Sequence, residues 1–388
     1  MAILAENAAP LMFQSTEIIP MHKIFVTVVL IFSLKDVHAT FQNPLWGGAD
    51  PYAVLINGTY YYVGCNGDDQ IWIGRSSALY PYVDYKPVYT FPEGQWNSKE
   101  VWGPAALFQW NDGRLYMYYT ADNGDNVNHR IGVLRAKTSN PQGEWEDLSL
   151  AVPVNTGGQW AISMTPFQDL SGNWYVTWSG WRDQNPFPQV TYIAQMISPT
   201  EIGPRVEISA PEYAWENSIQ PIQEGQHVFR RGDKLFLLYS GNASWTDEYC
   251  VGALVYHGGN VLDPVSWKKR SEPIMQKTTQ VFGPGGPAVV TSTDGNEFWM
   301  YYHSNNYSNS GWALRSINLI QLAFDANNNL LQLTPTPWQQ NMQGPSLNTL
   351  RGTKIAKNSQ STAMHPRTMF NLLGQQVGVK NYNKGYSP

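Results

Sequence analysis

The chain has 388 residues, of which 42% are hydrophobic and only 14% are charged, and its formal net charge is −5. This composition excludes a disordered chain, and the acidic balance leaves no basic surface for phosphate backbones, so nucleic-acid binding is set aside. With 33 Gly, 26 Pro and 13% aromatic residues, the sequence favours a folded, turn-rich, largely β protein with an ample core.

The first 39 residues predict a leader. Met21-His22-Lys23 precedes an apolar run over residues 24–34, and Val37 and Ala39 supply small residues at positions −3 and −1 of a cleavage site. A run of this length is too short to span a bilayer comfortably and is typical of a secretory signal that begins at Met21, with a buried strand as the alternative. The sequence therefore predicts a protein that is secreted or held at the cell surface, with no membrane span in its mature form.

From about residue 40 to residue 350 one pattern repeats five times: a turn glycine followed by an aromatic or aliphatic strand. The five glycines are 55, 59, 60 and 63 residues apart, at Gly58, Gly113, Gly172, Gly232 and Gly295. A small sheet cannot bury both of its faces alone, so hairpin signals with a period near 60 indicate sheets repeated around an axis. We predict an all-β fold, a five-bladed β-propeller over residues 40–350. Cys65 and Cys250 fall in different blades, and we expect two buried thiols rather than a bridge.

The periodic pattern stops after Leu350. Residues 357–362 are a polar linker, and residues 368–377 resemble the C-terminal sorting tails of bacterial outer-membrane secretion systems. A disordered tail is the alternative interpretation of residues 351–388.

The residue that starts each inner strand of a propeller joins a ring around one mouth of the central channel. Counting back eight or nine residues from each turn glycine places five positions on this ring: Asp50, Ala105, Ser163 or Met164, Glu224, and Gly286 or Pro287. Two of the five are acids, on blades that are not adjacent. Taken singly, an Asp before Pro can be an ordinary turn residue and a Glu before Gly can cap a loop.

Two carboxylates that face each other over a channel mouth can divide acid and base work if their surroundings separate their pKa values. Where the two carboxyl groups admit a water between them, the expected reaction is glycoside hydrolysis with inversion. The matched phase of Asp50 and Glu224 in two repeats favours this function over two unrelated turn residues.

Each blade carries a short motif at its inner strand or in a neighbouring loop. The motifs are Ala49-Asp50-Pro51, Glu100-Val101-Trp102-Gly103-Pro104, Trp160-Ala161-Ile162, Glu224-Gly225, Ser244-Trp245-Thr246, Tyr249-Cys250-Val251-Gly252 and Gly283-Pro284-Gly285. In order and spacing, from about Phe41 to Trp338, they resemble the blade motifs of family 43 of the glycoside hydrolases. The resemblance implies a secreted inverting enzyme that removes L-arabinofuranosyl or xylosyl units from plant cell-wall polysaccharides. It also implies that Asp50 is the general base and Glu224 the general acid.

Three ring residues depart from the family pattern. Ser163 stands where the family has a third Asp that raises the pKa of the acid, Ala105 replaces a Glu, and Gly286 replaces a His that often lies near a central metal ion. Without the negative charge of that Asp, we expect Glu224 to titrate lower than in relatives and the enzyme to be slower, unless Asp169 or Asp183 takes its place. With no His and few hard ligands on the ring, we expect no cofactor, and Ca²⁺ binding is doubtful.

The channel mouth should also present flat apolar faces to sugar rings. We predict substrate contacts from Trp102, Trp160 and Trp215, each of which has a core position as its alternative. Arg315 resembles the arginine with which the family reaches its substrate from the last blade, and its alternative is a surface arginine or a salt bridge that closes the ring. A non-catalytic glycan-binding propeller, derived from such an enzyme, is the competing function.

Overall fold

The computed structural model describes residues 38–346. Residues 1–37 and 347–388 lie outside this part of the chain, and with them lie the predicted sorting tail and all of the predicted leader except its last two residues, His38 and Ala39, which begin β1. Within residues 38–346, no helix has the length and apolarity needed to cross a membrane.

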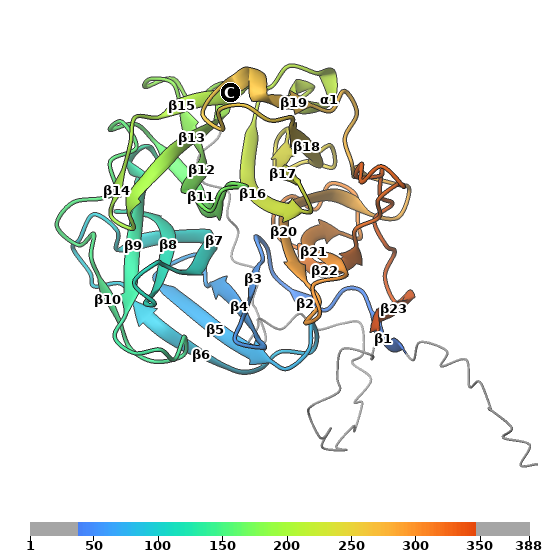
Figure 1. Cartoon of the computed structure of the whole chain (residues 1–388), viewed down its shortest axis with the longest axis horizontal. Helices are drawn as coiled ribbons and strands as arrows, with labels where there is room; N and C mark the ends of the chain where they lie inside the picture. The colour runs from blue at the N-terminus through green and yellow to red at the C-terminus, as the bar shows by residue number, and fades with distance from the viewer. Residues whose placement is uncertain (1–37, 347–388) are drawn as a thin grey trace, which may run out of the picture.

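Five antiparallel sheets surround a common centre (Figure 1). Blade one comprises β3 (Tyr52–Ile56), β4 (Thr59–Cys65), β5 (Gln70–Ser76) and β6 (Val83–Thr90). Blade two comprises β7 (Lys99–Gln109), β8 (Leu115–Asp122), β9 (Arg130–Ala136) and β10 (Trp145–Asp147). Blade three comprises β11 (Ala161–Gln168), β12 (Trp174–Trp181) and β13 (Gln189–Ser198), with β14 (Glu201–Ile202) and β15 (Val206–Ser209) both paired to β13.

Blade four comprises β16 (Gln223–Arg231), β17 (Lys234–Gly241), β18 (Cys250–Tyr256) and β19 (Trp267–Lys269). Blade five comprises β20 (Phe282–Thr291), β21 (Phe298–Asn305), β22 (Ser316–Gln321) and β2 (Trp46–Gly47). The remaining elements are a separate β1 (His38–Gln42) and β23 (Asn341–Ser346) pair and the short helices η1 (Asn126–Asn128), α1 (Ala214–Asn217) and η2 (Pro264–Ser266). The prediction of an all-β, five-bladed propeller is confirmed.

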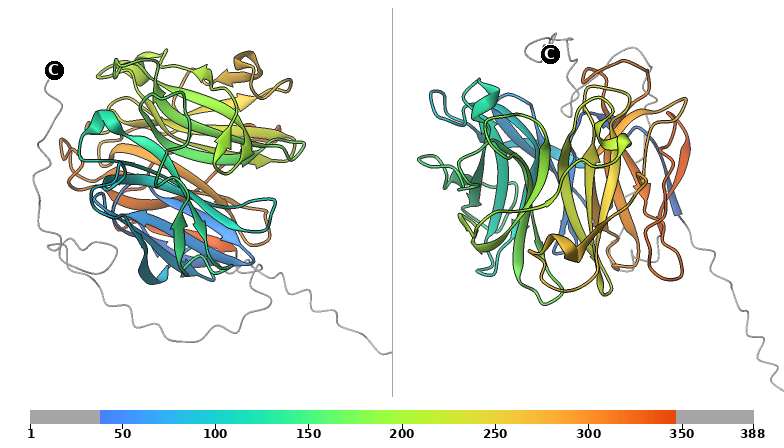
Figure 2. Two further views of the ribbon diagram at one scale, coloured as in Figure 1. Left: turned by 90° about the vertical axis from the view of Figure 1, so that its left-hand side faces the viewer. Right: turned by 90° about the horizontal axis from the view of Figure 1, so that it is seen from above.

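The inner strands close a ring, because β3 contacts β7, β7 contacts β11, β11 contacts β16, β16 contacts β20, and β20 returns to β3. Views at right angles to Figure 1 show the sheets packed face to face, with the loops gathered at the two ends of the strands (Figure 2). Large aromatic side chains fill the space between neighbouring blades, and Trp178 and Trp299 are each at most 1% exposed. Cys65 and Cys250 are both free thiols, as expected, but only Cys250 is buried, while Cys65 is partly exposed.

The N-terminal strand completes the last blade. Trp46 of β2 pairs with Ile317 of β22, and the next residues continue the contact as Gly48 N donates to Arg315 O at 2.9 Å. Asp50 follows two residues later, so ring closure itself places Arg315 beside Asp50.

The turn glycines have the backbone that the hairpin pattern predicts. Gly58 and Gly113 both adopt a φ of +77°, a left-handed conformation that glycine enters without steric cost. At their other ends the inner strands of blades two to five contain β-bulges, and Ser163 and Gly225 lie in two of them with φ of +60° and +64°. Because a bulge re-aims the neighbouring side chains, it turns the first residues of the inner strand toward the channel mouth.

Candidate active site

Asp50 lies at the mouth of the channel between blades five and two. Its backbone N–H donates to His303 Nδ1 at 3.1 Å, and its Oδ2 lies 3.8 Å from Arg315 Nη1. Gly103 packs against it so closely that a Cβ there would lie 2.8 Å from Asp50 Cβ. Burial raises the pKa of Asp50, and the positive charge of Arg315 opposes that rise. The carboxylate is thus held by an arginine, a histidine and a tight backbone contact.

Glu224 begins β16 on blade four, directly before the bulge at Gly225. Its Oε1 accepts the Tyr249 hydroxyl at 2.9 Å. Burial raises the pKa of Glu224 to about 7, and the hydrogen bond from Tyr249 acts in the opposite direction. A carboxyl group with this pKa keeps its proton near neutral pH and can therefore donate it.

Gly286 separates the two acids. On one side, a Cβ added to Gly286 would lie 3.3 Å from Asp50 Oδ1. On the other side, Gly286 approaches Gly225, the neighbour of Glu224, since a Cβ added to Gly225 would lie 3.7 Å from Gly286 Cα. The charge of Asp50 also contributes to the raised pKa of Glu224, as expected for carboxyl groups that share one opening. The structure therefore brings the two acids to the same mouth, in two different environments.

Comparison with known proteins identifies this arrangement. The model of glycosyl hydrolases family 43 matches residues 41–328, the stretch that contains all five blades. The chain belongs to family 43 of the glycosyl hydrolases.

Two of its relatives are named arabinofuranosidases. An extracellular exo-α-(1→5)-L-arabinofuranosidase of Streptomyces avermitilis is 30% identical over 280 residues, which are 69% of this chain and 57% of that protein. The enzyme with the same name from Streptomyces chartreusis is 28% identical over 69% of this chain and 84% of its own length. The chain thus spans little more than half of the first of these relatives.

Solved structures share the fold. An α-L-arabinofuranosidase from Lactobacillus brevis superimposes with a TM-score of 0.71 at 24% identity, over 77% of this chain and 98% of that one. A thermostable family 43 glycoside hydrolase gives a TM-score of 0.67 over 79% and 99% of the two chains.

Ser163, predicted from the sequence to stand in place of the family's third Asp, is 3% exposed and lies on β11, next to the strand β16 that carries Glu224. Its backbone N–H donates to Thr120 Oγ1 at 3.1 Å. Asp169 does not replace the missing charge, because it caps the far turn of blade three by accepting from Ser171 N and Asn173 N. The raised pKa of Glu224 therefore comes first from its burial, without a third carboxylate at the ring.

His303 is a site residue that the sequence analysis missed. It comes from the middle strand β21 and pairs with Gly285 across the hairpin of blade five. At Gly286 a Cβ would lie 2.8 Å from His303 Nδ1, so the close approach of this ring requires the glycine. The expectation that the ring lacks a histidine is wrong, because a neighbouring strand supplies one.

The tautomer of His303 bears on metal binding. Burial and the nearby Arg315 hold the pKa of His303 well below its usual range, so the ring is neutral. Since Nδ1 accepts the Asp50 N–H, the ring proton sits on Nε2, which has no hydrogen-bond partner. A protonated Nε2 offers no lone pair to a cation. The absence of a central Ca²⁺ stays a prediction, and metal analysis of the purified protein tests it.

Tyr249 is a second missed residue. Besides donating to Glu224, it stacks on His303 with ring centroids 5.7 Å apart and planes inclined by 7°. Gly285 makes room for it, since a Cβ there would lie 1.9 Å from the Tyr249 ring. Tyr249 and His303 thus form a continuous line of contacts from Glu224 to Asp50.

The predicted sugar-binding tryptophans have different surroundings. Trp102 is half-buried beside Gly103, and its ring lies on His129 at a centroid distance of 3.8 Å. Trp160 is only 2% exposed and stacks on Trp181, so its burial argues against a sugar platform there. Trp215 packs on Tyr239, and its indole N–H donates to Ser271 O at 2.8 Å. Both contacts are made within blade four, so one face and the N–H of this indole are already engaged by the protein.

A buried polar group supports Trp102 from behind. His129 Nδ1 lies 2.9 Å from Asp122 Oδ2, and both side chains are fully buried, while the Glu100 carboxyl group completes a cluster whose ligand atoms lie within 4.8 Å of one another. The two ring nitrogens of His129 also face the carbonyl oxygens of Asn126 and Glu100, at 3.1 and 3.2 Å. We therefore interpret this group as a buried polar support for the Trp102 ring.

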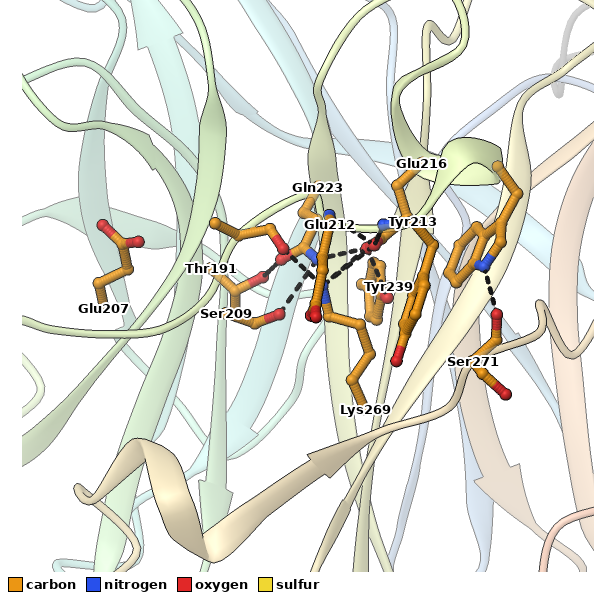
Figure 3. A network of polar contacts seen from close by, with 12 residues as sticks. Thr191, Glu207, Ser209, Glu212, Tyr213, Glu216, Gln223, Tyr239, Lys269 and Ser271 are labelled. Carbon is orange, nitrogen blue, oxygen red and sulfur yellow. Dashed lines mark hydrogen bonds and ion pairs between the residues drawn. The ribbon is translucent and has the colours of Figure 1, made fainter.

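A network in blade four holds the strand that carries the acid (Figure 3). Glu216 of α1 is fully buried, and its Oε1 accepts from Gln223 Nε2 at 2.6 Å and from the Tyr239 hydroxyl at 2.8 Å. Lys269 Nζ lies 3.0 Å from Glu216 Oε2. Gln223 directly precedes Glu224, and its Oε1 accepts from Thr191 at 2.9 Å. The network thus fixes the start of β16 and with it the backbone of Glu224.

Proposed function

We propose that this chain is a secreted, inverting glycosidase that releases L-arabinofuranosyl or xylosyl units from plant cell-wall polysaccharides. The observation that carries the proposal is the pair Asp50 and Glu224 at one mouth, the first beside a guanidinium and the second with a pKa of about 7. Of the two sugars, L-arabinofuranose is favoured by the activity for which the Streptomyces relatives are named, and their description as extracellular also supports secretion.

The reaction follows from the two environments. Glu224 gives its proton to the glycosidic oxygen as the bond from that oxygen to the anomeric carbon breaks. Asp50 takes a proton from a water molecule, and the water oxygen forms the new bond to the anomeric carbon from the opposite side. One C–O bond breaks, one forms, and the sugar is released with inverted configuration. Arg315, from the loop after β21, stabilises the ionised form of Asp50 that this role needs.

The test of this function is hydrolysis by the purified protein and by Asp50→Ala. We expect the wild type to hydrolyse nitrophenyl α-L-arabinofuranoside or β-xyloside, and the variant to lose about 10²–10⁴-fold in kcat, because the attacking water then lacks its base. NMR of the first-formed sugar should show the inverted anomer. Equal rates for the two proteins, together with undiminished glycan binding, would favour the non-catalytic binding propeller.

We also propose that Ser163 limits the rate. In Ser163→Asp a carboxylate enters the ring next to β16, and we expect a higher kcat and an alkaline limb of the pH profile that moves upward, because a nearby negative charge raises the pKa of Glu224. Ser163→Asn is the matched control, since it has the same shape without the charge. Unchanged rates and an unchanged profile in the Asp variant would show that the missing carboxylate does not matter.

A further inference from the structure

Two loops next to Glu224 form one connected surface. One joins β17 to β18 over residues 242–249, and the other joins β21 to β22 over residues 306–315. Asp247 ties them together, because its carboxylate accepts from Asn309 N at 2.9 Å and from the Ser308 hydroxyl. Gly283 N donates to Asp247 O at 3.1 Å, which anchors both loops to the inner strand of blade five. The surface they form is therefore fixed relative to the two acids.

This surface carries exposed aromatic rings. Trp312 is 38% exposed, although a tryptophan in a β-rich protein usually lies in the core. Trp245 is half-buried and meets Trp312 edge to face, with ring centroids 5.9 Å apart and planes at 84°. Trp160 and Trp181, by contrast, are at most 3% exposed. Near Glu224, the tryptophan side chains that a ligand can reach are thus Trp245 and Trp312, in the loops of blades four and five.

A serine connects this surface to Glu224. Trp312 Nε1 donates to Ser244 Oγ at 3.1 Å, and the Ser244 side chain is near enough to Glu224 to lower the pKa of that carboxyl group slightly. Arg315, which contacts Asp50, follows Trp312 by three residues in the same loop. The indole is therefore held by a serine that neighbours Glu224.

We propose that Trp312 and Trp245 form the platform that binds the departing part of the glycan, the pentose unit on the leaving-group side of the bond that is cut. A general acid stands next to the departing oxygen, so the surface beside Glu224 is where the rest of the chain must lie. The apolar C–H face of a pentose packs on an indole face, and its hydroxyl groups remain in water. This inference rests on the proposed function and adds to it the residues that recognise the polymer.

The test compares a substrate that has a sugar on the leaving-group side with one that has none. Trp312→Ala is assayed on the α-1,5-linked arabinotriose or xylotriose that the wild type prefers, and on the corresponding pentosyl fluoride. We expect KM for the trisaccharide to rise about tenfold with the fluoride unchanged, since the fluoride leaves no ring to stack. Trp312→Phe, which keeps an aromatic face, should recover most of the loss.

Trp174→Ala is the matched control. Trp174 is also half-buried, has Trp110 as a ring neighbour at 5.4 Å, and donates its Nε1 to the Asn111 side chain, but it lies at the far turn of blade three. We expect no change on either substrate. An equal loss on trisaccharide and fluoride in Trp312→Ala, or no loss on either, would overturn the platform.

The experiments distinguish a failure of the platform proposal from a failure of the proposed hydrolase function. If the wild type hydrolyses neither substrate, the hydrolase proposal is wrong, and calorimetric titration with the two trisaccharides then decides the platform. Binding that is weakened in Trp312→Ala and kept in Trp174→Ala supports it. Binding that is absent from the wild type, or unchanged in Trp312→Ala, refutes it.

Discussion

Glu224→Gln should lower kcat on arabino-oligosaccharides by about 10²–10⁴-fold, because the amide cannot give a proton to the departing oxygen. The loss should be much smaller on nitrophenyl glycosides, whose leaving group is acidic enough to depart without protonation. Glutamine keeps the size of the side chain, so the Tyr249 hydroxyl, which now donates to Glu224 at 2.9 Å, can still donate to the amide oxygen. The measurement is kcat for both substrate classes in both proteins.

The pH profile provides the second readout of the same variant. A general acid works only while it is protonated, so with a pKa of about 7 for Glu224 the wild-type kcat should fall as the pH rises through 7. At the other end activity should fall as the pH drops and Asp50 becomes protonated. In Glu224→Gln the alkaline limb should disappear while the acidic limb remains. A profile that keeps its alkaline limb in the variant would assign the acid to another residue.

The fold could be predicted because the repeat is local in sequence. Each turn glycine sits next to the strand it starts, and counting back from it gave Asp50 and Glu224, which share one mouth in the structure. The same counting works in the forward direction. His303 follows Gly295 by eight residues, and its ring lies against Gly286, the ring position nine residues before Gly295. A hairpin is symmetric about its turn, so this residue could have been found from the sequence, whereas the contact of Tyr249 with Glu224 depends on how a whole loop folds.

The aromatic platform could not be predicted, for a physical reason. The sequence pointed to Trp160 and Trp215 as sugar-binding residues and did not single out Trp312. What separates them is the packing of other blades: Trp181 covers Trp160 and Tyr239 covers Trp215, while Trp312 stays 38% exposed. The exposed fraction of a tryptophan side chain depends on how the blades pack against one another, so the sequence pattern within one repeat cannot predict it.

Glu216→Ala should destabilise the propeller by about 3–5 kcal/mol, because it removes the buried carboxylate that pairs with the ammonium group of Lys269. The carboxylate that remains, on Glu212 at 3.8 Å, is exposed to solvent. Lys269 is 9% exposed at its side chain, and Glu216 is fully buried. The measurement is the free energy of unfolding from chemical denaturation. Glu207→Ala is the matched control, since its pair with Arg182 lies at the surface and exposed pairs contribute about 0–1 kcal/mol.

The double variant Glu216→Ala with Lys269→Met should be more stable than Glu216→Ala alone, since removing the second charge removes the buried ammonium group as well. It should still lose catalytic rate, because Gln223 Nε2 no longer has Glu216 Oε1 at 2.6 Å and the start of β16 is then held by fewer contacts. We therefore expect stability to recover and kcat to stay low, with KM changed less than kcat. A double variant with full activity would mean that the network stabilises blade four without positioning Glu224.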